Sequence, residues 1–115
     1  MVRLVVGVGQ VTLLLRYAQS LKEKRNVVKS LMQRLQNRGF TVTECGYREE
    51  AKKVCLGFSL VADNPGVIEE AFDKILPLFW GDHEIVDKKR QIVDFFDVDA
   101  FNVDEALVTN PREPY

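Results

Sequence analysis

The sequence predicts a single α+β domain built in the order strand, helix, strand, strand, helix, strand. Three observations lead to this prediction. Four segments show the alternation, or the β-branched and aromatic content, that is typical of strands. Two segments between them carry apolar residues at helical spacing, and each is preceded by a residue type that caps helices. The chain of 115 residues, 46% of them apolar, can bury the core of one domain without disulfides or a structural metal.

The first strand is predicted over residues 3–16, where apolar residues alternate. We expect its odd-numbered face, from Val5 to Leu15, to contact the helices. Gly7 and Gly9 lie on that face, and a glycine inside a strand indicates a bulge or the close approach of another part of the chain. Since no third glycine follows at the spacing of a nucleotide-binding loop, no nucleotide site is predicted here.

The first helix is predicted over residues 20–38. Ser20 and Glu23 form the S-x-x-E capping box, in which each side chain accepts a hydrogen bond from a free backbone N–H at the helix start. Gly39 follows the last helical residue, as expected where a helix ends. The buried stripe of this helix is predicted to consist of Leu21, Val28, Leu31, Met32 and Leu35.

This helix carries cations at its start, where they are least favourable. Its N-terminus already bears about half a positive charge, so cations in the first turn disfavour the helix slightly unless an anion binds there. Two interpretations remain open: an anion-binding site, or a solvated basic surface. Lys24 projects onto the apolar stripe, so its ammonium must reach back to water or point into a site. The candidate anion- or RNA-binding residues are Lys22, Lys24, Arg25, Lys29, Arg34 and Arg38.

A hairpin is predicted from strands at residues 40–46 and 53–62. If its loop is centred near Glu50, Cys45 and Cys55 lie roughly opposite each other. They could form a thiol switch or serve as two small apolar side chains, and the second interpretation is favoured because no basic neighbour on the same face lowers a thiol pKa. Two cysteines are too few for a secreted disulfide framework or a four-ligand metal site, which favours a cytoplasmic protein.

The second helix and the last strand complete the domain. Asn64 and Pro65 are typical of a helix start, and Pro77 predicts that this helix ends at about Leu76. The last strand is predicted over residues 83–96, and its charged middle is typical of a strand at the edge of a sheet.

The order of these elements is that of the ferredoxin-like split βαβ fold (βαββαβ), in which two helices cover one face of a four-stranded antiparallel sheet. The domain is predicted to span residues 1–96, followed by an acidic C-terminal extension, residues 97–115, that we expect to be partly docked. RNA-recognition domains of this topology stack bases on aromatic residues of the third strand, but residues 53–60 do not match their pattern. Base stacking on the open face is therefore not predicted.

Charge is distributed unevenly along the chain although the net charge is only −1. Residues 1–38 contain eight Lys and Arg against one acid, and residues 39–115 contain eight against sixteen. The net charge gives no overall field that would attract nucleic acid, so any such binding must depend on a local basic surface. The sequence leaves open whether folding keeps the opposite charges apart or pairs them.

The chain resembles the YlxP-like family of small bacterial proteins, a domain of unknown function. The resemblance covers roughly residues 4–96, and the acidic extension lies outside it. It rests on SLKEKR at residues 20–25, with Val27-Val28-Lys29-Ser30-Leu31, Arg34-Leu35-Gln36-Asn37-Arg38, Phe40-x-Val42 and, more weakly, Leu56-Gly57 and Asp63-Asn64. It implies a ferredoxin-like fold and a cytoplasmic protein in a family discussed alongside translation and ribosome-maturation proteins. It implies no catalytic residue.

These observations favour a non-enzymatic binding module that docks RNA or ribonucleoprotein phosphates through the basic N-terminal part of the first helix. The alternative is a self-associating scaffold, dimeric or larger, without a nucleic-acid role. A third alternative is an unrecognised small enzyme, but the sequence shows no nucleophile–base pair and no metal-ligand spacing, and His83 is its single histidine. No cofactor or metal is expected. No membrane partner is expected either, since no segment approaches the ~20 apolar residues of a membrane-spanning helix.

Overall fold

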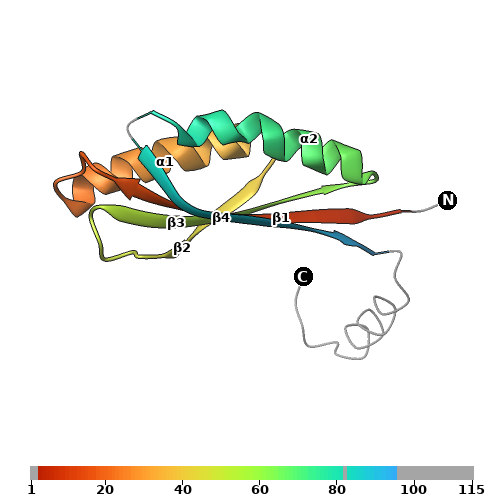
Figure 1. Ribbon diagram of the computed structural model, residues 1–115, viewed down its shortest axis with the longest axis horizontal. Coiled ribbons are helices and arrows are strands. Elements are labelled where there is room, and N and C mark those ends of the chain that lie inside the picture. Colours follow the sequence, from red (N-terminus) through yellow and green to blue (C-terminus); the bar gives the residue numbers. More distant parts are fainter. Residues whose placement is uncertain (1–2, 82, 96–115) are drawn as a thin grey trace, which may run out of the picture.

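The structure, a computed structural model, describes residues 3–81 and 83–95 and confirms the predicted order of elements (Figure 1). Phe96 and the acidic extension at residues 97–115 lie outside the described residues. The elements are β1 (Val5–Leu15), α1 (Leu21–Asn37), β2 (Thr41–Gly46), β3 (Lys53–Ala62), α2 (Pro65–Ile75), the short 3₁₀ helix η1 (Leu76–Phe79) and β4 (His83–Asp94).

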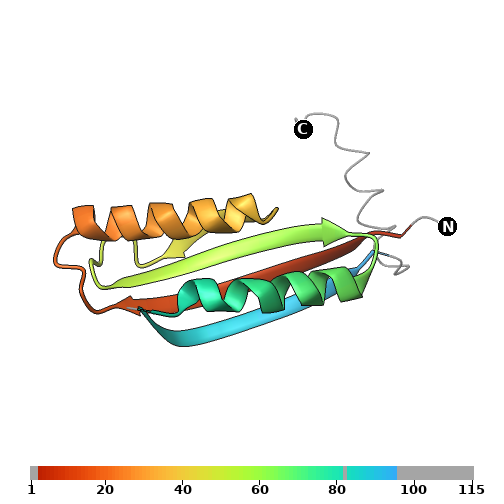
Figure 2. The ribbon, with the colours of Figure 1, turned by 90° about the horizontal axis from the view of Figure 1, so that it is seen from above.

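The four strands form one antiparallel sheet in the order β2-β3-β1-β4, so β4 is an edge strand as predicted. Both helices lie on the same face of this sheet (Figure 1). Viewed from above, α1 lies towards the β2 edge and α2 towards the β4 edge (Figure 2). The predicted ferredoxin-like α+β fold is therefore confirmed.

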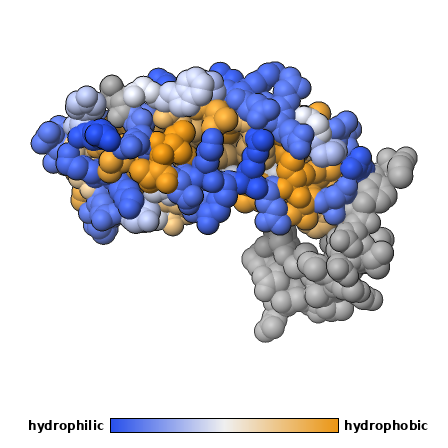
Figure 3. Space-filling model, in the orientation of Figure 1, coloured by the Kyte–Doolittle hydropathy of each residue, from blue (hydrophilic) through white to orange (hydrophobic). Residues whose placement is uncertain are grey.

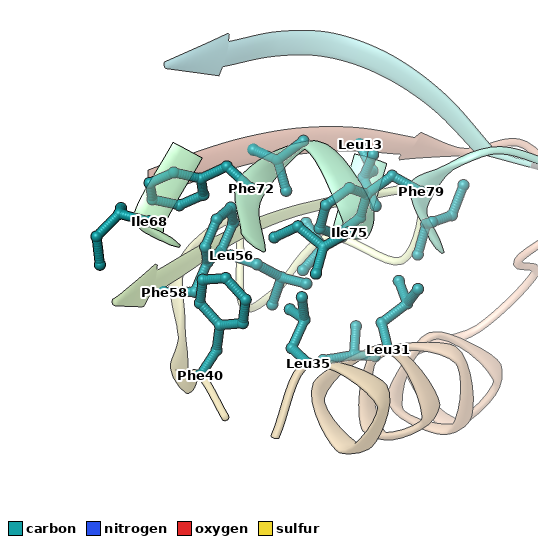
Figure 4. Packing of buried hydrophobic residues seen from close by; sticks show 14 of the residues in the cluster. Leu13, Leu31, Leu35, Phe40, Leu56, Phe58, Ile68, Phe72, Ile75 and Phe79 are labelled. Atoms are coloured by element: carbon teal, nitrogen blue, oxygen red, sulfur yellow. The ribbon is translucent and has the colours of Figure 1, made fainter. Parts of the chain in front are cut away.

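The core lies between the sheet and the helices, where Leu13, Leu31, Leu35, Phe72 and Ile75 pack together (Figure 4). The odd-numbered face of β1 contacts the helices, as its alternation predicts. A Cβ atom at Gly7 would lie 2.3 Å from Ile68 of α2, and one at Gly9 would lie 2.3 Å from the Phe58 ring. The two glycines thus allow the close approach that their positions in the strand indicate.

The helix ends follow the local signals in the sequence, with one difference. Ser20 Oγ accepts a hydrogen bond from Glu23 N at 3.2 Å, whereas the Glu23 carboxylate accepts from Gln19 N at 2.6 Å, one residue earlier than in a standard capping box. Gly39 follows the last turn of α1 with φ +89°, a value that favours glycine.

The second helix begins and ends close to its predicted limits. Asn64 Oδ1 accepts from Gly66 N at 2.7 Å, and Pro65 is the first helical residue. The α-helix ends at Ile75, one residue before the predicted end, because the chain continues as the tighter 3₁₀ helix η1, which contains Pro77.

Candidate anion-binding groove

A groove of about 480 Å³ lies between α1 and β2. Two side chains of α1, Arg25 and Lys29, line it from one side, and Arg48 lines it from the turn that follows β2. Gln33 and Gln36 add amide groups further along the helix. Apolar lining comes from Leu21, Val28 and Met32. The groove therefore combines exposed cations with a partly apolar floor, and we call it the α1–β2 groove.

The spacing along α1 explains which cations meet at the groove. Arg25 and Lys29 are four residues apart and share one side of the helix, and Lys22 precedes Arg25 by three residues on the same side. All three side chains are exposed. Within residues 3–81 and 83–95 none of them forms an ion pair, in contrast to Arg3 and Arg16, which pair with acids of β4.

Arg48 is a groove residue that the sequence did not single out. Its Nη2 donates to the backbone carbonyl of Glu44 at 2.5 Å, so the exposed side chain folds back along β2. The preceding residue, Tyr47, has φ +61°, a left-handed conformation that turns the chain sharply here. The only signal in the sequence was a cation in a predicted hairpin loop, which does not say where its side chain points.

Lys24 differs from the other candidates because it is 2% exposed. Its ammonium lies 3.1 Å from Glu44 Oε2 and also donates to the carbonyl of Tyr47. Of the two positions that the sequence left open for Lys24, the structure shows the inward one. Its expected contact with phosphate requires a correction, since its charge is already matched by a carboxylate of the protein. Lys24 joins α1 to β2 at the base of the α1–β2 groove.

Arg34 and Arg38 do not belong to the α1–β2 groove. Arg34 is five residues beyond Lys29, which places it on the opposite side of α1. Arg38 lines a separate cavity of about 330 Å³ near α2, with Glu70 and Lys74. Of the six predicted cations, the structure thus brings Lys24, Arg25 and Lys29 together at the groove, with Lys22 beside them and with Lys24 paired to Glu44.

The groove has the chemistry of an anion site. Since the Lys24 ammonium and the Glu44 carboxylate pair with each other, the charge facing solvent comes from Arg25, Lys29 and Arg48. Guanidinium groups can bind two oxygens of one phosphate or carboxylate, and ammonium groups add point charges. Among the described residues, no group of three His, Cys, Asp or Glu side chains could hold a metal ion.

The cysteines meet as the predicted hairpin register implies. Their sulfur atoms lie 3.2 Å apart, with Cys55 buried and Cys45 on the exposed edge strand. Partial burial of its sulfur and the hydrogen bond to Cys55 raise the pKa of Cys45 to about 11. A thiol with so high a pKa is a poor nucleophile at neutral pH, which supports a structural role for the pair.

None of the described helices is both long and apolar enough to cross a lipid bilayer.

A family model described as "Protein of unknown function (DUF503)" matches residues 6–93. No curated protein matches the chain.

Several solved structures share part of the arrangement at low identity. The de novo designed protein Foldit4 is 14% identical, with 79% of this chain and 96% of that chain covered and a TM-score of 0.43. A putative chlorite dismutase is 14% identical, with a TM-score of 0.46, and the match covers 85% of this chain but only 48% of that protein. A second designed protein, LFR1 1 with ferredoxin fold, is 14% identical over 85% of this chain and 88% of that chain, with a TM-score of 0.34.

Proposed function

The chain belongs to the DUF503 family of proteins of unknown function, and for this member we propose a role as a binding module that docks RNA or ribonucleoprotein phosphates in the α1–β2 groove. The observation that carries the proposal is the convergence of Arg25, Lys29 and Arg48 on one groove, without an ion pair to any residue of the described part. The resemblance to YlxP-like proteins over roughly residues 4–96 is in keeping with RNA as the polyanion, since that family is discussed alongside translation and ribosome-maturation proteins.

Phosphate contacts explain why such a site needs only a few exposed cations. Each contact releases counterions, so affinity for a single strand falls with salt with a log–log slope of about −0.7 per phosphate. Three contacts, from Arg25, Lys29 and Arg48, predict a slope of roughly −2. Binding of this kind depends little on base sequence, in keeping with an open sheet face that lacks the RNA-recognition pattern.

The test compares two double charge reversals, one within α1 and one at its C-terminal end. Arg25→Glu/Lys29→Glu removes two groove cations, and Arg34→Glu/Arg38→Glu makes the same change of charge outside the groove. We expect the first variant to bind single-stranded RNA roughly a hundredfold more weakly, since each lost contact to a charged group is worth about 1.4 kcal/mol or more. Its salt slope should become shallower by roughly 1.4 units. Fluorescence anisotropy at four salt concentrations measures both quantities.

The control variant should retain the affinity and the slope to within about twofold, apart from a small effect of net charge. Equal losses in both variants would indicate a non-specific response to charge, and unchanged binding by the groove variant would overturn the proposed function.

A second copy of the chain is the second candidate partner, favoured by a different surface. Val8, Val61 and Val93 are 48%, 62% and 41% exposed on the sheet face that the helices leave open. Leu4 and Phe95 extend this apolar surface at the same end of the sheet, where β1 begins and β4 ends. Apolar atoms also reach the surface at that end in the view of Figure 3. Because symmetric dimers often cover such a face, self-association is the alternative function.

A further inference from the structure

The face of β4 that looks towards the helices is interrupted by cations. A strand whose one face is covered by helices normally carries apolar residues on that face. In β4 this face carries Ile85, Lys88, Arg90 and Ile92, whose partners in β1 all lie on its helix-covered side. A bulge at Thr12/Leu13 shifts the register between the first and the second of these residues. Two cations thus stand where the core pattern calls for apolar side chains.

An apolar cavity of about 340 Å³ lies beside these cations, between α2 and β4. Phe58, Phe72, Ile75 and Phe79 line it, and all four are buried (Figure 4). Figure 3 views the molecule from the side of β4 and α2 and shows apolar atoms at the surface between hydrophilic groups. The cavity is therefore an apolar hollow with a charged border, open at one edge of the sheet.

Lys88, Lys89 and Arg90 line the cavity, and the two on the helix-covered face of β4, Lys88 and Arg90, differ in how their charge is used. Arg90 Nη1 lies 3.1 Å from Asp73 of α2, and its guanidinium carbon lies 5.7 Å from the centre of the Phe72 ring. Arg90 thus connects β4 to α2 beside the cavity, and its charge is partly matched. Lys88 is exposed and forms no ion pair within the described segments, so its ammonium is available to an anion.

We propose that this cavity binds a small organic anion with an apolar body, such as a medium-chain carboxylate. The apolar body lies among Phe58, Phe72 and Phe79, and the charged head lies at Lys88 with Arg90 beside it. The volume is close to the lower limit of ligand pockets, roughly 300–1,000 Å³, so the ligand is small. Inward-pointing cations also protect an edge strand from pairing with other chains, but that role does not require a cavity beside them.

Calorimetry with three ten-carbon probes tests the proposal on the full chain, with the two ionic probes below their micellar concentrations and the uncharged probe below its solubility limit. Decanoate has the proposed chemistry, decanol removes the charge, and decyltrimethylammonium reverses it. We expect decanoate to bind, decanol to bind at least about tenfold more weakly, and the cation to bind most weakly. Decanoate should also shift the methyl NMR signals of Val11 and Ile75, which line the cavity.

Two variants locate the site. Lys88→Glu should weaken decanoate binding at least about tenfold, and Lys29→Glu, the same change of charge in the α1–β2 groove, should leave it unchanged. Leu76→Trp fills the cavity from η1 and should abolish binding, while circular dichroism verifies that the variant is folded.

Equal affinities for decanoate and decyltrimethylammonium, or decanoate shifts confined to other parts of the molecule, would overturn the proposal and leave edge protection as the role of Lys88. Absence of decanoate binding at millimolar concentration would do the same. The inference is independent of the proposed function, because the α1–β2 groove lies towards the other edge of the sheet (Figure 2). Lys88→Glu should accordingly retain RNA binding, so that each proposal can fail alone.

Discussion

At the scale of single residues, Lys24 shows that a charged side chain can belong to the interior and still be anticipated from the sequence. Its position on the apolar stripe of α1 predicted that the ammonium would point inward or reach back to water. Its partner could not be predicted, because Glu44 is twenty residues away in a strand whose register is set by β3. A buried ion pair gives little net stability, but losing one partner leaves the other uncompensated.

We therefore expect Lys24→Met to destabilise the protein by about 3 kcal/mol, since the partly buried Glu44 carboxylate loses its ion-pair partner and the Tyr47 carbonyl loses its donor. Urea denaturation measures the change. Lys24→Met/Glu44→Leu, which removes both charges, should be more stable than the single variant. Lys29→Met, on the exposed side of the same helix, should stay within about 0.5 kcal/mol of the wild type. A loss no larger than that of Lys29→Met would contradict the role of Lys24.

The thiol pair predicts that the stability of the protein and the alkylation rate of Cys45 depend on pH. The pKa of Cys45 is raised to about 11 in the folded protein from an ordinary value of 9.0, so the folded state holds this proton more tightly than the unfolded state does. The resulting stability is complete below about pH 9 and is lost as the pH rises from 9 to 11. The alkylation rate of Cys45 should keep increasing up to about pH 11, as followed by mass spectrometry with iodoacetamide.

Cys55→Ser provides the comparison, because it changes the hydrogen-bond partner of Cys45 and should lower the pH at which the alkylation rate levels off. A rate in the wild type that already levels off near pH 9 would show that the folded protein does not raise this pKa.

At the scale of secondary structure, the helices were predictable to within one or two residues because their limits depend on nearby side chains. Ser20, Gly39 and Pro65 act within one turn, and the structure places each at the expected end. The bulges in the sheet were not predictable, since each arises only when two distant strands pair. The bulge between Glu44 and Gly46 lies two residues before Arg48. The register shift between Ile85 and Asp87 of β4 determines which face of the strand carries Lys88. The parts of both sites that the sequence did not reveal thus come from strand register.

The packing of β1 gives a prediction at this scale. Gly9→Ala would place a Cβ atom 2.3 Å from the Phe58 ring and should destabilise the protein by about 2 kcal/mol, the usual effect of overpacking. Gly57→Ala in β3 is the matched control, because its Cβ would meet its nearest neighbour, Cys45 Sγ, at an ordinary 3.5 Å. Thermal unfolding of both variants measures the difference. Equal melting temperatures would mean that Phe58 can move aside without loss.

At the scale of the whole molecule, folding pairs some of the opposite charges and keeps others apart, and the sequence had left both outcomes open. Arg3 pairs with Asp94 at 2.8 Å and Arg16 pairs with Glu84 at 2.5 Å, so β4 neutralises cations at both ends of β1. The cations of α1 that face the α1–β2 groove stay unpaired within the described residues. A near-neutral protein therefore retains a local basic surface, which the net charge alone could not show.

The open sheet face makes a prediction about assembly. If a second copy covers it, light scattering should give a dimeric mass for the full chain, and Val61→Lys should give a monomer, because a charge would then be buried in the interface. Glu69→Lys, on the exposed side of α2, is a control that should leave the mass unchanged. A monomer for the unaltered chain at millimolar concentration would remove self-association as the alternative function.

The central position of β1 also affects how the chain folds while the ribosome synthesises it. β1 pairs with β3 up to Ala62 on one side and with β4 up to Asp94 on the other. At translation rates of about 5–20 residues per second, roughly 2 to 6 seconds separate the appearance of these two partners. During that interval one side of β1 lacks its neighbour, and an unpaired strand edge of this kind is prone to pair with other chains until β4 is complete.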